Sequence, residues 1–173
     1  TGDIDFTIAC WAKLTDKNVS YAIITKKRNS APDGDYDITY FVTDDRFTFA
    51  ISNGVDVAQR INANNLGSPS AGTLYFIVAW HDATANTINI QVNNGTVNSA
   101  AETQTIVDSP SQFRIGAFAD AGNEIYLNGS VDEVGFWKRV LTVAERTALY
   151  QGGSGLTYPF SGEFGGTFLF NLI

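Results

Sequence analysis

The chain has 173 residues, of which 44% are hydrophobic and 17% charged, and its net charge is −7. This length fits one domain with a real core. Its one basic run, Lys26-Lys27-Arg28, is too short for the cationic face that phosphate binding needs, so we expect no nucleic-acid ligand. The single cysteine, Cys10, excludes an intramolecular disulfide and a cysteine-based zinc site, and its apolar neighbours predict a buried thiol.

No apolar run approaches the roughly 18 residues of a membrane-spanning helix, and we expect no membrane insertion. The chain begins at Thr1 rather than at a methionine. We therefore expect it to be a fragment, a processed product or an excised domain of a longer protein.

Short segments rich in β-branched and aromatic residues follow one another along the chain. In RFTFAIS, Phe47 and Phe49 alternate with polar or small residues, and in NTINIQV, Ile88 and Ile90 do the same. This period of two is typical of half-buried strands. Turn-forming stretches such as SNG (52–54) and NNG (93–95) separate the segments and predict hairpins. The predicted strands are 4–14, 20–28, 36–43, 46–52, 73–82, 86–95, 112–119, 130–139 and 166–173.

One helix is predicted near the C-terminus. Thr142 begins a capping box whose partner is Glu145, three residues later, and the glycines at 152–153 end the helix. A β-rich chain with one short helix predicts an all-β fold, an antiparallel two-sheet β-sandwich whose edge the helix covers. The buried stripe of the helix is expected to consist of Leu141, Ala144, Ala148 and Leu149.

Three stretches give the sequence a family resemblance: FTIACWAKL (6–14), FRIGAF (113–118) and GSVDEVGFWKRVLTVAERTALYQGGSGLTYPF (129–160). They resemble the concanavalin A-like, laminin G-like jelly-roll domains, and most of all the bacterial and phage branch related to pentraxins. The resemblance implies a laminin G-like β-sandwich over residues 1–160.

Two features depart from the family pattern. Almost nothing precedes Asp3, where such domains usually open with a strand and a metal-associated loop. GTFLFNLI, at 166–173, follows the expected end and resembles the opening strand of a next copy in a tandem array. We expect 161–173 to be an extra strand, which either begins a next repeat or takes the place of the missing first strand. The second alternative leaves fewer sheet edges open.

The acidic pair Asp132-Glu133 stands inside the predicted strand SVDEVGFW. Regular alternation would point Val131 and Glu133 to one face, and Asp132 and Val134 to the other. The two carboxylates would then not converge on one glycosidic bond, which requires carboxyl groups roughly 5–10 Å apart. Related sandwich glucanases carry Glu-x-Asp-x-x-Glu on one strand face, and this sequence lacks that motif. We therefore expect no enzyme activity and a structural role for the pair.

Calcium is the cofactor that the resemblance suggests. It prefers several oxygen ligands, carboxylates among them, and APDGDYD holds the best local cluster, Asp33-Gly34-Asp35. An ordinary turn is the alternative there, as it is for the acidic pair at 44–45. The resemblance adds a calcium-associated role for Asp132. The candidate calcium ligands are therefore Asp33, Asp35 and Asp132.

The remaining candidate residues concern small-molecule ligands. The one histidine, His81, has no Gly-x-Ser-x-Gly elbow to work with, and we expect it to be a plain surface residue. Trp80 and Trp137 are expected to pack the core. Carbohydrate platforms are usually exposed aromatic rings beside amides and carboxylates, which makes the candidate ligand-binding residues Tyr36, Tyr40, Asn53, Asn93, Asn123 and Tyr126.

The leading hypothesis is a non-catalytic binding module for a glycan or a surface protein. It would belong to a larger extracellular, cell-surface or virion protein. The alternative is a purely structural or adhesion repeat of a surface or phage structural protein, which has no small ligand and contacts neighbouring copies of the same domain.

Overall fold

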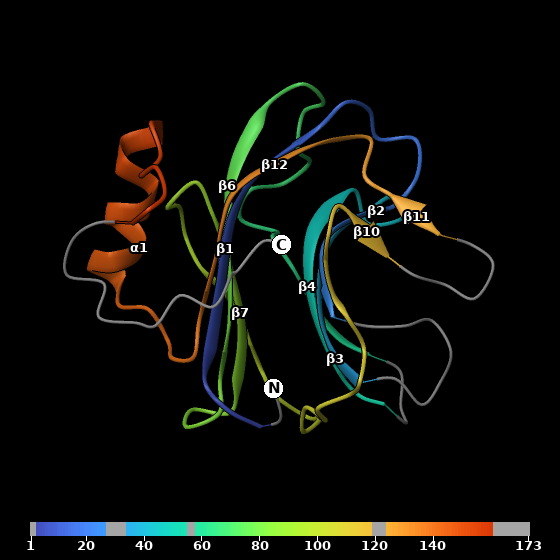
Figure 1. The fold of residues 1–173 in the computed structure, drawn as a ribbon, viewed down its shortest axis with the longest axis vertical. Helices are drawn as coiled ribbons and strands as arrows, with labels where there is room; N and C mark the ends of the chain where they lie inside the picture. The colour runs from blue at the N-terminus through green and yellow to red at the C-terminus, as the bar shows by residue number, and fades with distance from the viewer. Residues whose placement is uncertain (1–2, 27–33, 55–57, 119–123, 161–173) are drawn as a thin grey trace.

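The structure is a computed structural model of the chain, and it describes residues 3–26, 34–54, 58–118 and 124–160. Its elements are β1 (Phe6–Leu14), β2 (Tyr21–Lys26), β3 (Gly34–Phe41), β4 (Arg46–Asn53), β5 (Gln59–Asn62), β6 (Leu74–Asp82), β7 (Thr87–Val92), β8 (Asn98–Ala101), β9 (Phe113–Ile115), β10 (Ala117–Phe118), β11 (Ile125–Tyr126), β12 (Gly129–Trp137), α1 (Val143–Tyr150) and a 3-10 turn at Gln151–Gly153. Sheet A has the order β12-β1-β6-β7-β8, and sheet B has the order β5-β4-β3-β2-β9. The two sheets face each other, with α1 on the outer side of sheet A (Figure 1). The predicted antiparallel β-sandwich with one short helix is confirmed.

The main core fills the space between the two sheets. Alternate residues of each strand point into it, because successive side chains of a strand leave opposite faces. Phe6 of β1 stacks on Phe136 of β12, with ring centroids 5.6 Å apart. The fully buried members from β1, β3 and β4 include Phe6, Ile8, Cys10, Ala12, Ile38, Phe47, Phe49 and Ile51.

A second core lies on the outer face of sheet A, under α1. There Trp11, Phe76 and Trp80 project from β1 and β6 and meet Leu141 and Leu149 from the helical segment. The helix therefore covers a sheet face and not an edge, which corrects the sequence expectation (Figure 1). Trp80 and Trp137 are 6% and 3% exposed, so the prediction that they pack the core is confirmed.

The helix itself begins as predicted. Thr142 is the N-cap, and the capping box with Glu145 is complete. The buried stripe differs from the expectation, because Ala144 and Ala148 are exposed while Arg146 is buried. The guanidinium of Arg146 lies 4.3 Å from the ring centroid of Trp80, a cation–π contact that a buried cation can make. No helix among the described residues is long and apolar enough to span a bilayer.

Several strands were not visible in the sequence. The four-residue strands β5 and β8, at the edges of the two sheets, and the two-residue strand β11 show no alternation that would reveal them. The predicted strand 112–119 is divided at Gly116, whose φ of 68° breaks the extended backbone between β9 and β10. The predicted strand 166–173, and with it the proposed segment 161–173, lies outside the described residues.

A β-bulge between β1 and β12 changes which way the acidic pair points. The register shifts between the pairs Ala9↔Gly135 and Trp11↔Asp132, so Glu133 and Val134 together face one residue of β1. Glu133 has a φ of 47° at this point. Val131 and Val134 consequently both pack against the main core. The alternation predicted for this strand is wrong, because the extra residue shifts its phase.

The thiol of Cys10 is fully buried between the sheets, as predicted. Loss of hydration on burial raises the pKa of this thiol to about 12. The thiol is therefore uncharged in the folded chain at neutral pH.

We expect the second core to contribute measurably to stability. Leu149→Ala removes a side chain that is 2% exposed and leaves a cavity under α1, so the free energy of unfolding should fall by about 2–5 kcal/mol in urea titrations. Val143→Ala in the same helix is the control, because Val143 is 66% exposed. Equal effects of the two substitutions would contradict the second core.

The capping box predicts a pH dependence. Arg139 donates to both carboxylate oxygens of Glu145, at 2.6 and 2.8 Å, and this pairing lowers the pKa of Glu145 from 4.5 to about 2. The contribution of Glu145 to stability is then fully present above about pH 4.5 and is lost as the pH falls toward about 2. In denaturant titrations Glu145→Gln should be less stable than the parent chain at pH 7, and the difference should shrink across that window. A difference that stays constant down to pH 2 would contradict the assignment.

Candidate functional site

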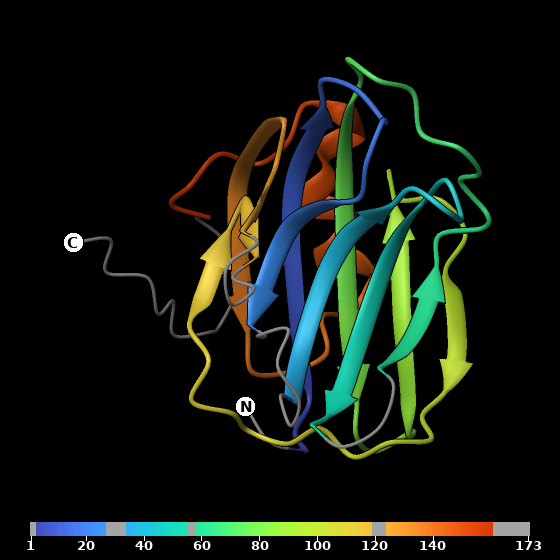
Figure 2. The same ribbon diagram turned by 90° about the vertical axis from the view of Figure 1, so that its right-hand side faces the viewer.

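A groove of about 210 Å³ lies on the outer face of sheet B, the face that no helix covers. Figure 2 looks at the molecule from this side. In β3, Tyr36, Ile38 and Tyr40 point into the core, so the intervening residues point into the groove. The described residues that line it are Ser20, Tyr21, Ala22, Asp37, Thr39, Phe41, Arg60, Phe118 and Ile125.

Register across three strands of sheet B places the groups of the groove. Asp37 of β3, Ala50 of β4 and Arg60 of β5 lie side by side in one row. Because the middle residue is only an alanine, no large side chain separates the carboxylate from the guanidinium. Arg60 also stacks over the ring of Phe41, with Cζ 4.6 Å from the centroid.

Each end of the groove has an aromatic ring. Phe41 and Arg60 form one end, while Phe118 and Ile125 come from the small β10-β11 sheet at the other. Between them lie the carboxylate of Asp37 and the hydroxyl of Thr39. Apolar rings that flank a few polar groups form the kind of site that binds small polar ligands with apolar faces. Among the described side chains Arg60 has no carboxylate partner, so its exposed N–H groups can donate to a ligand.

The tyrosines expected to bind ligand are core residues. Tyr36 and Tyr40 are 3% and 1% exposed, and their rings pack between the sheets. The hydroxyl of Tyr40 donates to Asp45 Oδ1 at 2.7 Å, and burial together with this bond raises its pKa to about 12. The structure thus corrects the expectation that these rings are exposed. Their alternation with Asp37 and Thr39 predicts that the two pairs of side chains lie on opposite faces of β3. It does not predict which of these faces packs in the core.

The other expected ligand residues are scattered. Asn53 ends β4, and Tyr126, which is 62% exposed, lies in β11 beside Ile125. Asn93 follows β7, and its Oδ1 accepts from the backbone N–H of Phe76 at 2.9 Å. None of these lines the groove of sheet B, and Asn93 lines a separate pocket of about 250 Å³ with Asn65 and Asn98. Asn123 lies outside the described residues.

Asp35, expected to bind calcium, is engaged by other groups. It is fully buried, its Oδ2 accepts from the Lys26 ammonium, and its Oδ1 accepts from the backbone N–H of Ser109 at 2.7 Å. A cation already belongs to the protein at this position, so Asp35 does not fit a calcium site. Asp33 lies outside the described residues.

Asp132 is exposed, and its Oδ1 accepts from the backbone N–H of Glu133 at 2.9 Å. The carboxylate of Glu133 in turn accepts from the backbone N–H of Tyr158 at 2.7 Å. Within the described part of the chain, Asp132 belongs to no group of three metal-ligating side chains. The acidic pair holds the bulge and the segment after the helix, and the calcium-associated role of Asp132 stays a prediction.

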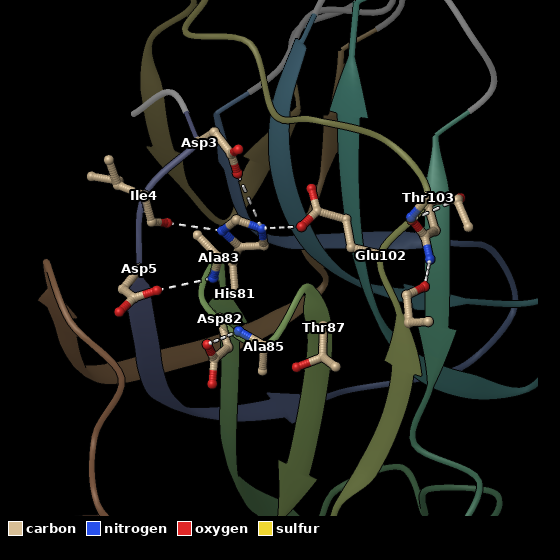
Figure 3. Close-up of polar contacts among 12 residues, drawn as sticks. Asp3, Ile4, Asp5, His81, Asp82, Ala83, Ala85, Thr87, Glu102 and Thr103 are labelled. Atoms are coloured by element: carbon tan, nitrogen blue, oxygen red, sulfur yellow. Dashed lines mark hydrogen bonds and ion pairs between the residues drawn. The ribbon is translucent and has the colours of Figure 1, made fainter.

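The histidine is not a surface residue. His81 is fully buried at the end of β6, and both ring nitrogens have partners, as Figure 3 shows. The expectation of a surface histidine is wrong because His81 falls on the inward face of β6, in phase with Ile77 and Ala79. Sequence reasoning also missed Arg60, for which β5 gave no signal. Phe41, in contrast, could have been found from its alternation with Tyr40.

The match to a family of known proteins decides where the chain belongs. The family model of the concanavalin A-like lectin/glucanases superfamily, in its laminin G branch, matches residues 1–145. The chain belongs to this superfamily. The resemblance drawn from the sequence motifs is thereby confirmed. No curated protein matches the chain.

Several solved structures share the fold. The CBM40 domain of the Ruminococcus gnavus IT-sialidase, bound to α2,3-sialyllactose, has a TM-score of 0.64 and 13% identity, over 84% of this chain and 82% of its own. A heptameric SAP-like pentraxin from Limulus polyphemus has a TM-score of 0.63 and 11% identity, over 95% and 78% of the two chains. Domains LG4-5 of the mouse laminin α1 chain have a TM-score of 0.56 and 14% identity, over 77% and 35%.

The ion pair between Lys26 and Asp35 can be tested by substitution, because Asp35 is buried. Lys26→Met would leave the Asp35 carboxylate buried without its cation, and we expect the free energy of unfolding to fall by about 3 kcal/mol. The double variant Lys26→Met/Asp35→Asn should recover much of this loss, since the buried charge is then absent. Urea titration compares both variants with the parent chain, with Lys138→Met, on an exposed residue, as the control. A single variant as stable as the control would contradict the pairing.

Proposed function

We propose that the chain is a non-catalytic glycan-binding module whose ligand occupies the groove on the outer face of sheet B. The observation that carries the proposal is the composition of this groove. It combines the apolar rings of Phe41 and Phe118, the Arg60 guanidinium and the carboxylate of Asp37 in one lining. A sugar ring offers both an apolar C–H face and a rim of hydroxyls, which such a lining complements.

The comparisons support the same proposal. One structural relative is a carbohydrate-binding module with sialyllactose bound, and the chain spans most of that module. By its charge, Arg60 favours a glycan with a carboxylate or another electron-rich group at this end of the groove. We infer that the module acts in a larger extracellular, cell-surface or virion protein.

The groove is poorly suited to glycoside hydrolysis. That reaction uses two carboxyl groups on opposite sides of the scissile bond. Among the described lining residues, Asp37 is the one carboxylate. Asp132 and Glu133 lie on sheet A and are occupied by backbone N–H groups. These positions support binding without catalysis.

The test is a glycan array of acidic and neutral sugars, run with calcium and again with chelator. Binding to a defined class of sugar is expected in both conditions, because Asp37 is the one carboxylate among the described residues that line the groove. The affinity for the best ligand should then fall about tenfold or more, which is about 1.4 kcal/mol or more, in Phe41→Ala and in Arg60→Ala. Calorimetry measures the affinity, and far-UV circular dichroism checks that each variant is folded.

Lys138→Ala is the matched control, because it removes an exposed cation just after β12 of sheet A and outside the groove of sheet B. If the chain binds no sugar of the array in either condition, the glycan proposal is wrong. That result would favour a structural or adhesion role with protein neighbours. Binding that survives both groove substitutions would instead move the ligand to another surface.

A further inference from the structure

Three side chains from distant parts of the sequence meet at the end of the sandwich near the β6-β7 hairpin. They are Asp3, just before β1, His81 at the end of β6, and Glu102, just after β8 (Figure 3). Their ligand atoms all lie within 4.8 Å of one another. Within the residues that the structure describes, this is the one place where three metal-ligating side chains converge.

The backbone fixes which nitrogen of His81 carries a proton. Nδ1 is 2.8 Å from the carbonyl oxygen of Ile4, an atom that only accepts, so Nδ1 must donate. A neutral imidazole that is protonated at Nδ1 has a lone pair at Nε2. That lone pair points to Glu102 Oε2, at 2.6 Å, and lies 3.7 Å from Asp3 Oδ1. Three electron-pair donors therefore face one another, and a positive charge is needed between them.

Glu102 has a second feature that a simple ion pair does not explain. Its side chain is only 7% exposed, and its other oxygen, Oε1, is buried with no hydrogen-bond partner among the described residues. A buried carboxylate oxygen without a partner is unfavourable, and such atoms are rare in native structures. A metal ion bound by this carboxylate would satisfy it.

The surroundings hold Glu102 in place. Its backbone N–H donates to the carbonyl of Asn86 at 2.7 Å. The side chain of Gln59 bonds to the residues on either side of it, donating to the carbonyl of Ala101 and accepting from the N–H of Thr103. These bonds join β5 of sheet B to the edge strand β8 of sheet A. Glu102 is thus fixed by the fold, whereas Asp3, 49% exposed, lies on the solvent side of the cluster.

We propose that Asp3, His81 and Glu102 bind a first-row divalent metal ion, with Zn²⁺ as the best fit. One imidazole nitrogen and two carboxylates are a ligand set that Zn²⁺ accepts, with water in the remaining position. The ion would also balance the charge, since it meets two carboxylates and a neutral ring. The Ile4 carbonyl acts as the outer hydrogen-bond partner that orients a metal-bound histidine.

The role of this metal is structural. It ties the segment before β1 to the ends of β6 and β8, at one end of sheet A. The site is independent of the groove on sheet B, with which it shares no residue. Failure of either proposal therefore leaves the other standing.

The experiment uses the full chain after treatment with chelator. Equilibrium dialysis against Zn²⁺ should show one ion per chain, and Zn²⁺ should raise the melting temperature of the chain, because an ion bound to the folded state stabilises it. Asp3→Asn and Glu102→Gln should each weaken Zn²⁺ binding at least tenfold. The amide of Glu102→Gln can donate to the lone pair of His81 Nε2, so this variant should fold without metal. If Glu102→Gln does not fold, Asp3→Asn still tests the site, because Asp3 lies on the solvent side of the cluster.

Asp82→Asn is the control. Asp82 stands next to His81, but its Oδ1 accepts from the N–H of Ala85, and it is not part of the cluster. This variant should bind Zn²⁺ like the parent chain. The proposal is overturned if the parent chain takes up no stoichiometric Zn²⁺, or if uptake persists in both Asp3→Asn and Glu102→Gln. The first result would mean that His81 carries the positive charge itself, as an imidazolium paired with Glu102.

Discussion

The rest of the structure depends on the burial of β1 on both of its faces. One face carries Phe6, Ile8 and Cys10 into the space between the sheets, and the other carries Ala9 and Trp11 under α1. Its neighbours in sheet A are β6 and β12, so the strand has no open edge either. A strand covered on all sides reads as a continuous apolar run, as FTIACW does. Sheet A is therefore the inner layer of a three-layer molecule, and the outer face of sheet B is the one that no described helix covers.

The bulge in β12 adjusts this central strand to its neighbour. The extra residue of β12 opposite β1 lets both Val131 and Val134 reach the main core, although they are three positions apart. It also turns Glu133 toward the segment that follows the helix, where it accepts from the backbone of Tyr158. Asp132 thus supports the bulge through the backbone N–H of Glu133, and Glu133 fastens the last part of the described chain onto sheet A.

The sequence was sufficient for those features that rest on local patterns. Alternation identified most of the long strands, the Thr-x-x-Glu pattern identified the start of the helix, and the motif around Trp137 identified the family. It was insufficient where distant segments decide the outcome. Alternation shows that Tyr36 and Asp37 face opposite ways, but only the opposing sheet determines that Tyr36 is inside. Likewise Arg60 belongs to the four-residue strand β5, and the sequence of so short a strand does not predict its pairing with β4.

The same limit applies to the candidate sites. The groove brings together β2, β3, β5 and the small β10-β11 sheet, and the cluster around His81 brings together segments up to 99 positions apart in sequence, from Asp3 to Glu102. No local spacing encodes such meetings. A bulge is equally hard to predict from the sequence. One extra residue changes which side chains of the strand face the core, but it does not change the type of residues in the strand. Regular alternation therefore gave a wrong orientation for Asp132 and Val134.

The position of the lone cysteine has a practical meaning for the chain as a whole. Cys10 lies at the middle of β1, opposite the bulge, with its thiol fully buried. A reagent that attacks thiolates can reach it only when β1 separates from sheet B and the thiol is hydrated again. Local fraying of loops or of the helix does not expose it. The reactivity of this one sulfur therefore reports the opening of the entire sandwich, and it leaves the surface of the folded molecule free for cysteines placed there by design.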